Sequence, residues 1–249
     1  MKITSQEELD GLRASGRLAA QILHELIERV EVGITTRELD LMAAKMMEDA
    51  GAQSAPIVTY NYPGYTCISV NEEIAHGIPG DRVIEDGDVV NVDVSLVLGG
   101  FFADNGFTTV VGTADQEVHD LCKATLEARD EAISKIRPGM PLSMLGRVFQ
   151  KHAKQVGAKI IRNLCSHGVG RALHEQPDQI LGYFDRKEKR RFAPHMVLTV
   201  EPFLSLGADH TYTAQDEWTL LNTQGGRSAQ FEHTIVVRPG GPPEILTRI

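Results

Sequence analysis

Four acidic residues of this chain stand inside apolar segments, where a lone carboxylate is costly. Asp93 interrupts a valine-rich run, Asp104 follows FFA, Glu201 closes MVLTV, and Glu232 stands within AQFEHTIVV. A buried carboxylate without a partner costs several kcal/mol or takes up a proton. Within residues 83–128, Lys123 is the only lysine or arginine. Taken singly, each acid would more often be a satisfied polar residue or an exposed one, but together they point to a bound cation.

One histidine completes this set of donors. His167 lies in SHGVG, where Gly168 and Gly170 let the backbone come close to a ligand. Carboxylate and imidazole donors without a thiolate suit Mn, Fe(II), Co and Zn. Four carboxylates against one imidazole favour two ions over one, and a pair of ions can activate water for hydrolysis.

The turn at Gly99-Gly100 brings two of these acids together. It joins two β-type runs, which is a strong hairpin signal. If the residues that flank the turn pair with each other, Asp104 lies opposite Ser95, and Asp93 lies on the same face two residues away. The Cβ atoms of the two aspartates are then about 7 Å apart or less.

The elements that would position these residues occur in one order twice, two helices and then β-type runs. Helix starts are indicated at Ser5, Thr35, the segment 113–116 (TADQ) and Ser143. The β-type runs are CISV (67–70), VVNVDVSLVL (89–98), FFADNGFTTVV (101–111), KIIR (159–162), MVLTVEPFLS (196–205), EWTLLN (217–222) and AQFEHTIVV (229–237). This order predicts an α+β fold in one domain, residues 1–249, with similar halves of about 1–112 and 113–249.

Composition excludes several classes of protein. The chain has 249 residues and a formal net charge of −9 at pH 7, which argues against nucleic acid or an anionic membrane as a direct partner. No apolar stretch reaches the ~20 residues of a membrane span, and no signal peptide is visible. Three widely spaced cysteines indicate a reducing compartment, and we expect a cytoplasmic protein.

Five segments together resemble the signatures of one enzyme family. They are NEEIAHGIPG (71–80), NVDVSLVLGGFFADNG (91–106), SHGVGRALHEQP (166–177), LTVEPF (198–203) and SAQFEHTIVV (228–237). In order and spacing they are similar to type I methionine aminopeptidases of the short bacterial type. The resemblance implies the pita-bread fold, with two pseudo-symmetric α/β halves around a dimetal site. It also implies removal of the initiator methionine from nascent chains whose second residue is small.

The resemblance also assigns roles to the five donors. It makes Asp93, Asp104, His167, Glu201 and Glu232 the ligands of two divalent ions. Asp104 and Glu232 would bridge the ions, and Asp93 would chelate one of them. Glu201 would also accept a proton from the attacking water.

Further positions match the family's substrate contacts. His174 would contact the substrate carbonyl, and His76 would hydrogen-bond to the scissile amide nitrogen. Tyr62, Cys67 and Trp218 fall at positions of the methionine pocket, although composition alone would place the single tryptophan in a core. A thioether favours such apolar and aromatic contacts.

Three positions depart from the commonest family pattern. Asn105, Ser166 and Leu173 stand where Thr or Ser, Gly, and in several members an aromatic residue are usual. We expect them to affect rate and pocket preference, since none removes a ligand. The resemblance also allows a monovalent cation near Asn71 and Ser228.

Two rival interpretations share the fold. Xaa-Pro dipeptidases and aminopeptidase P usually carry an additional N-terminal domain, for which this chain has no room. A binding protein that has lost its metals would not keep all five donors. The 27 positions from His174 to Glu201 leave no space for the insertion of type II enzymes. We therefore expect a monomeric type I enzyme, acting on nascent chains at the ribosome.

Overall fold

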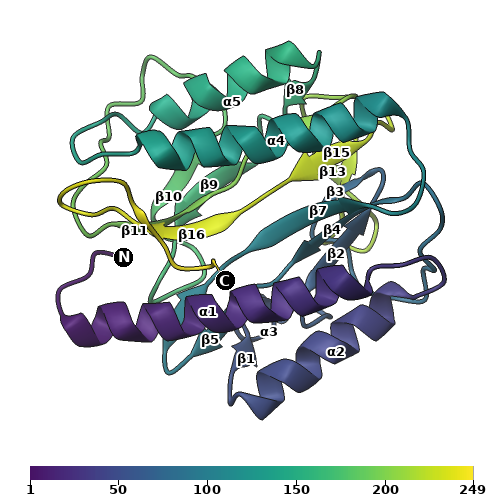
Figure 1. Ribbon diagram of the computed structural model, residues 1–249, viewed down its shortest axis with the longest axis horizontal. Helices are drawn as coiled ribbons and strands as arrows, with labels where there is room; N and C mark the ends of the chain where they lie inside the picture. Colours follow the sequence, from purple (N-terminus) through teal and green to yellow (C-terminus); the bar gives the residue numbers. More distant parts are fainter. Residues whose placement is uncertain (249) are drawn as a thin grey trace.

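In the computed structural model, which describes residues 1–248, one pair of helices lies above the strands and one pair lies below them in the view of Figure 1. The first half contributes α1 (Gln6–Arg29) and α2 (Thr36–Asp49), followed by the short α3 (Ala55–Tyr60). The second half contributes α4 (Gln116–Lys135) and α5 (Met144–Gln155). Among residues 1–248, no helix is both long and apolar enough to cross a bilayer.

Helices α1, α2 and α5 begin at the predicted capping residues Ser5, Thr35 and Ser143. The N-cap of α4 is Asp115, within the predicted segment 113–116 but two residues after its first residue. The Ser5 side chain accepts a hydrogen bond from the Glu8 backbone N–H, and Thr35 forms a complete capping box with Glu38. The Glu8 carboxylate does not complete the box at Ser5, because it accepts its bond from the Thr4 backbone N–H instead. These caps satisfy N–H groups that would otherwise stay unpaired in the first turn.

The long β-type runs are correct in place but are broken into shorter strands. The strands are β1 (Gln53–Ser54), β2 (Cys67–Val70), β3 (Glu73–Ala75), β4 (Val89–Asp93), β5 (Leu96–Leu98), β6 (Phe101–Ala103), β7 (Gly106–Val110), β8 (Lys159–Ile160), β9 (Cys165–Gly168), β10 (Glu175–Leu181), β11 (Val197–Val200), β12 (Phe203–Ser205), β13 (Thr211–Thr213), β14 (Leu220–Asn222), β15 (Ser228–Gln230), β16 (His233–Val236) and β17 (Glu244–Ile245). The breaks matter for function: β4 ends at Asp93, while Asp104, Glu201 and Glu232 lie in gaps between strands.

The two halves repeat one scheme of strand pairing. In the first half, β4 lies between β2 and β7, and β5 lies between β1 and β6. In the second half, β11 lies between β9 and β16, and β12 lies between β8 and β15. The correspondence places Asp93 and Glu201 at the first break of each half, between β4 and β5 and between β11 and β12. Asp104 and Glu232 lie at the second break, between β6 and β7 and between β15 and β16.

The predicted register of the hairpin is confirmed. Leu98 pairs with Phe101, and β4 and β7 continue the same register on the other side of the break. The Val94 N–H donates to the Asn105 carbonyl at 2.9 Å, which carries the ladder across the gap. The hairpin is therefore continuous in pairing while its central residues turn away from regular strand geometry.

The halves join through buried polar contacts as well as apolar packing. The Asn91 amide donates to Gln230 Oε1 at 2.9 Å, and the Thr108 hydroxyl donates to the Gln230 carbonyl at 2.7 Å. The Gln230 N–H donates back to the Thr108 hydroxyl at 3.0 Å. Beside them, the rings of Phe107 and Phe231 meet edge to face, 4.9 Å apart. These contacts fix one half against the other and so set the spacing of the acids.

Replacement of Thr108 by valine should weaken this junction. Thr108→Val keeps the side-chain volume but leaves the buried Gln230 N–H without its acceptor, which costs about 1–3 kcal/mol of the free energy of unfolding. Urea denaturation followed by circular dichroism measures the loss. Thr109→Val, on the neighbouring and less buried position, is the matched control. Equal stability of the two variants would contradict the proposed role of this contact.

Candidate metal centre and substrate cavity

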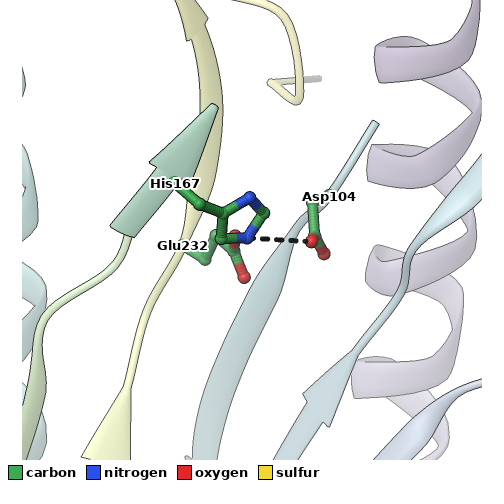
Figure 2. Close-up of side chains that lie close together, drawn as sticks. All are labelled: Asp104, His167 and Glu232. Carbon is green, nitrogen blue, oxygen red and sulfur yellow. Dashed lines mark ion pairs between the residues drawn. The ribbon is translucent and has the colours of Figure 1, made fainter. Parts of the chain in front are cut away.

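Three of the predicted donors converge on one point. Asp104, His167 and Glu232 are each at least nine-tenths buried, and each offers a ligand atom within 4.8 Å of the other two. Figure 2 shows the His167 ring directed at the Asp104 carboxylate, with Glu232 beside it. His167 comes from β9, whereas Asp104 and Glu232 come from the matching breaks of the two halves.

The other two predicted donors flank this cluster. His167 Nε2 lies 3.4 Å from Glu201 Oε1 and 3.6 Å from Asp104 Oδ2. The Ser95 hydroxyl donates to Asp104 Oδ1 at 2.7 Å and lies 3.3 Å from Asp93 Oδ1. The structure therefore brings all five residues together, as the sequence predicts, and the hairpin places Ser95 between the two aspartates.

Burial and mutual repulsion make this group of acids unusual. Burial, reinforced by the charges of Asp104 and Glu201, raises the pKa of Asp93 well above its ordinary range. Burial and the charge of Asp104 likewise raise the pKa of Glu201 and of Glu232. Among residues 1–248, no lysine or arginine forms an ion pair with any of these four acids. Protein groups alone thus leave their charge uncompensated.

The imidazole is held in the form that a metal needs. His167 Nδ1 lies 3.0 Å from the Gly168 carbonyl, to which it donates, so that Nε2 carries the lone pair facing the acids. Burial lowers the pKa of His167 to about 4, which keeps the ring neutral at neutral pH. A neutral imidazole with a fixed tautomer is the state in which histidine binds metal ions.

One atom of the cluster lacks a partner. Glu232 Oε1 is buried without a hydrogen bond, while Glu232 Oε2 accepts one from the Gln230 amide at 2.9 Å. An unpaired buried carboxylate oxygen among other carboxylates is costly unless a cation binds there. The donor set, its burial and this orphaned oxygen fit a divalent metal.

A cavity of about 200 Å³ opens beside the acids. It is lined by the five donors and by all the residues expected to contact the substrate, namely Tyr62, Cys67, His76, His174 and Trp218. The rings of Tyr62 and Trp218 meet edge to face at 5.2 Å. Burial raises the pKa of the Cys67 thiol well above its ordinary value, so the thiol is an apolar wall of the cavity at neutral pH.

The three residues that depart from the family pattern lie in different surroundings. The Ser166 hydroxyl accepts a hydrogen bond from the Glu201 backbone N–H at 3.0 Å and so helps to hold Glu201. Leu173 is buried and lines the cavity next to His174. The Asn105 backbone N–H donates to Asp104 Oδ1, and Asn105 lines a different cavity.

Two positioning residues were missed by the sequence analysis. The Tyr60 hydroxyl lies 2.6 Å from His174 Nδ1, and the Thr199 hydroxyl donates to Glu201 Oε1 at 2.5 Å while it accepts from the His167 N–H. Thr199 could have been found from alternation, because it stands two residues before Glu201 in a strand. No local signal links Tyr60 to a histidine 114 residues further along.

Comparison with known proteins agrees with this geometry. Residues 10–239 match the model of metallopeptidase family M24. The chain is 42% identical to the methionine aminopeptidase of Staphylococcus epidermidis over 97% of each chain. The chain therefore belongs to metallopeptidase family M24 and, within it, to the methionine aminopeptidases. The expected family and hydrolase class are confirmed.

Solved structures confirm the expected fold. The methionine aminopeptidase of Thermotoga maritima superposes with a TM-score of 0.95 at 33% identity, over the whole of both chains. The prolidase of Pyrococcus furiosus matches with a TM-score of 0.77 at 21% identity, over 99% of this chain and 65% of that one. The second likeness shows the shared pita-bread fold alone.

Metal loading at neutral pH should release protons. Burial and mutual repulsion raise the pKa values of Asp93, Glu201 and Glu232, so these carboxyl groups bind protons more tightly than exposed acids do, and a cation that binds there competes with those protons. Titration calorimetry of Mn²⁺ at pH 7, in two buffers of different ionisation enthalpy, measures the number released. The exposed Asp81→Asn variant should behave as the parent. A binding enthalpy that does not depend on the buffer would contradict the proton-loaded state.

Loss of the Tyr60 hydroxyl should affect turnover more than substrate affinity. Tyr60→Phe removes the group that orients His174, and we expect kcat to fall about 5–10-fold with little change in KM. Steady-state kinetics with a methionyl peptide measures both constants. Tyr65→Phe, a nearby exposed tyrosine, is the control. A kcat unchanged in Tyr60→Phe would show that His174 does not depend on this contact.

Proposed function

We propose that the enzyme hydrolyses the peptide bond after an N-terminal methionine, on chains whose second residue is small. The observation that carries this proposal is one cavity in which the acids and His167 adjoin an apolar pocket formed by Tyr62, Cys67 and Trp218. A methionine thioether is favoured by apolar and aromatic contacts. The identity of 42% to a protein named methionine aminopeptidase supports the same substrate.

We propose further that Asp93, Asp104, His167, Glu201 and Glu232 hold two divalent ions, of cobalt, manganese, iron(II) or zinc. When bound, the ions supply Lewis-acid polarisation of the substrate carbonyl and lower the pKa of water. Donors restricted to oxygen and nitrogen support these metals, and four carboxylates provide enough negative charge for two ions.

The chain's own residues would then handle the protons. Glu201 would accept a proton from the attacking water and pass it to the departing amine. The water oxygen bonds to the carbonyl carbon as the C–N bond breaks. Thr199 donates to one Glu201 oxygen and fixes the orientation of its carboxyl group. This geometry favours a single position of the base, which general-base catalysis requires.

Two histidines would bind the reacting peptide. His174 lines the cavity, and with the Tyr60 hydroxyl as the donor to Nδ1, the proton of the His174 ring is on Nε2, which would donate to the carbonyl oxygen as negative charge develops. His76 lines the same cavity and would contact the scissile amide nitrogen. The ring centroids of His174 and His167 are 4.1 Å apart, so the histidine that would hydrogen-bond to the carbonyl lies next to the histidine that would bind the metal.

The proposed setting is a monomer that acts on nascent chains at the ribosome, in the cytoplasm. Cys67, Cys122 and Cys165 are all free thiols, which supports a reducing compartment. We propose one catalytic domain over residues 1–249, with halves near 1–112 and 113–249, supported by the repeated strand pairing. A monovalent cation near Asn71 and Ser228 stays a prediction.

A peptide assay tests the proposed reaction. Protein loaded with Co²⁺, Mn²⁺ or Fe²⁺ should release free methionine from a Met-Ala peptide. Glu201→Gln should reduce kcat by roughly 10²–10⁴-fold, because it removes the proton acceptor. Chromatographic detection of free methionine measures the rate. Glu117→Gln, at an exposed position of α4, should retain the parent rate.

A parallel Xaa-Pro peptide separates the rival activity. Release of the residue before proline without release of methionine would contradict the proposed substrate. Parent-like activity of Glu201→Gln would contradict the proposed proton acceptor while leaving the substrate assignment intact.

A further inference from the structure

A second cavity, of about 250 Å³, lies behind the candidate metal cluster. Asn105 and His233 line it, and they directly follow Asp104 and Glu232 in the chain. The cavity shares no lining residue with the substrate cavity. The segments Asp104–Asn105 and Glu232–His233, which carry two of the metal donors, therefore separate the two cavities.

One side of this cavity is apolar. Ala20, Leu23 and Ile27 present one face of α1, since they are spaced three to four residues apart. Phe107 of β7 closes the wall and also packs against Phe231. This wall is suited to an aliphatic or aromatic group and offers it no hydrogen bond.

The other side contains hydrogen-bond donors that the protein leaves available. Asn105 is only 2% exposed, and its Nδ2, the donor of the amide, bonds to none of residues 1–248, while the acceptor Oδ1 is also without a partner. Arg129 is 7% exposed, and it contacts Asp130 through Nε and Nη2. None of the described residues accepts a hydrogen bond from Arg129 Nη1, so this group is available to a ligand. Arg248 lines the same cavity.

The remaining polar groups of the lining are already engaged. His233 Nδ1 lies 3.0 Å from the Thr247 hydroxyl, and His24 Nε2 lies 3.4 Å from Glu28. No carboxylate is among the described lining residues. Two guanidinium groups and one amide thus face an apolar wall without a negative charge between them.

We propose that this cavity binds a small apolar monocarboxylate. Its carboxylate would accept hydrogen bonds from Arg129, Arg248 and the Asn105 amide, and its hydrocarbon part would pack against α1 and Phe107. Guanidinium groups bind carboxylates with short, charge-assisted hydrogen bonds. The volume lies below the ~300–1,000 Å³ of pockets for drug-sized ligands, which restricts the ligand to a small acid.

Three probes of similar size test the ligand class. Sodium hexanoate, 1-hexanol and hexylammonium chloride are titrated into the metal-loaded enzyme at constant ionic strength, and binding is measured by calorimetry. We expect hexanoate to bind about tenfold more tightly than the alcohol, with no measurable binding of the amine. Equal affinity for all three probes would overturn the proposal.

Two variants locate the binding. Arg248→Glu reverses an exposed charge of the cavity, and Ala20→Leu fills its apolar side. Each should weaken hexanoate binding about tenfold or more, whereas Arg238→Glu, an exposed arginine outside the lining, should bind as the parent. Circular dichroism establishes that each variant is folded.

Unchanged hexanoate affinity in Arg248→Glu would overturn the proposal, since the acid would then bind elsewhere, including at the metals. This variant decides the question even if Ala20→Leu proves unstable, because Arg248 contributes an exposed side chain and not core packing.

Discussion

The cost of burying four carboxylates around one imidazole is the constraint on which the rest of the structure depends. No lysine or arginine among the described residues pairs with these acids, and their pKa values are raised by burial and by one another. Two breaks in each half of the fold accommodate them, because a residue in a gap can turn its side chain inward without the alternation of a strand. Ser95, Thr199 and Ser166 then fix the acids through short hydrogen bonds.

The repeated strand scheme explains how distant segments deliver such similar groups. Asp93 ends β4 and Glu201 follows the equivalent strand β11, while Asp104 and Glu232 precede the equivalent strands β7 and β16, so each half contributes two acids at matching places. The site forms only when the halves dock. That docking depends on Gln230, which bonds to Asn91 and Thr108 of the first half and to Glu232 of the site itself. A substitution that disturbs Gln230 would therefore also disturb Glu232, one of the proposed metal donors.

Local patterns in the sequence predict a large part of this arrangement. Capping residues locate four helices, the glycine pair fixes the hairpin register, and apolar surroundings mark the acids. The strand breaks could not be predicted, because valine-rich runs favour continuous strands. Only the buried acids within these runs argue against a continuous strand. Helix α3 was missed since it is six residues long and contains β-branched residues. The Tyr60–His174 contact and the cavity behind Asn105 depend on tertiary packing, which leaves no local signal.

Anomalous scattering from crystals grown with Mn²⁺ tests the central claim most directly, since it locates the ions without reference to activity. The account predicts two peaks that are both within coordination distance of oxygen or nitrogen atoms of Asp93, Asp104, His167, Glu201 and Glu232. A single peak would reduce the proposed pair to one ion. The absence of any peak among these residues, in crystals that bind manganese elsewhere, would contradict the claim that a metal compensates the buried acids.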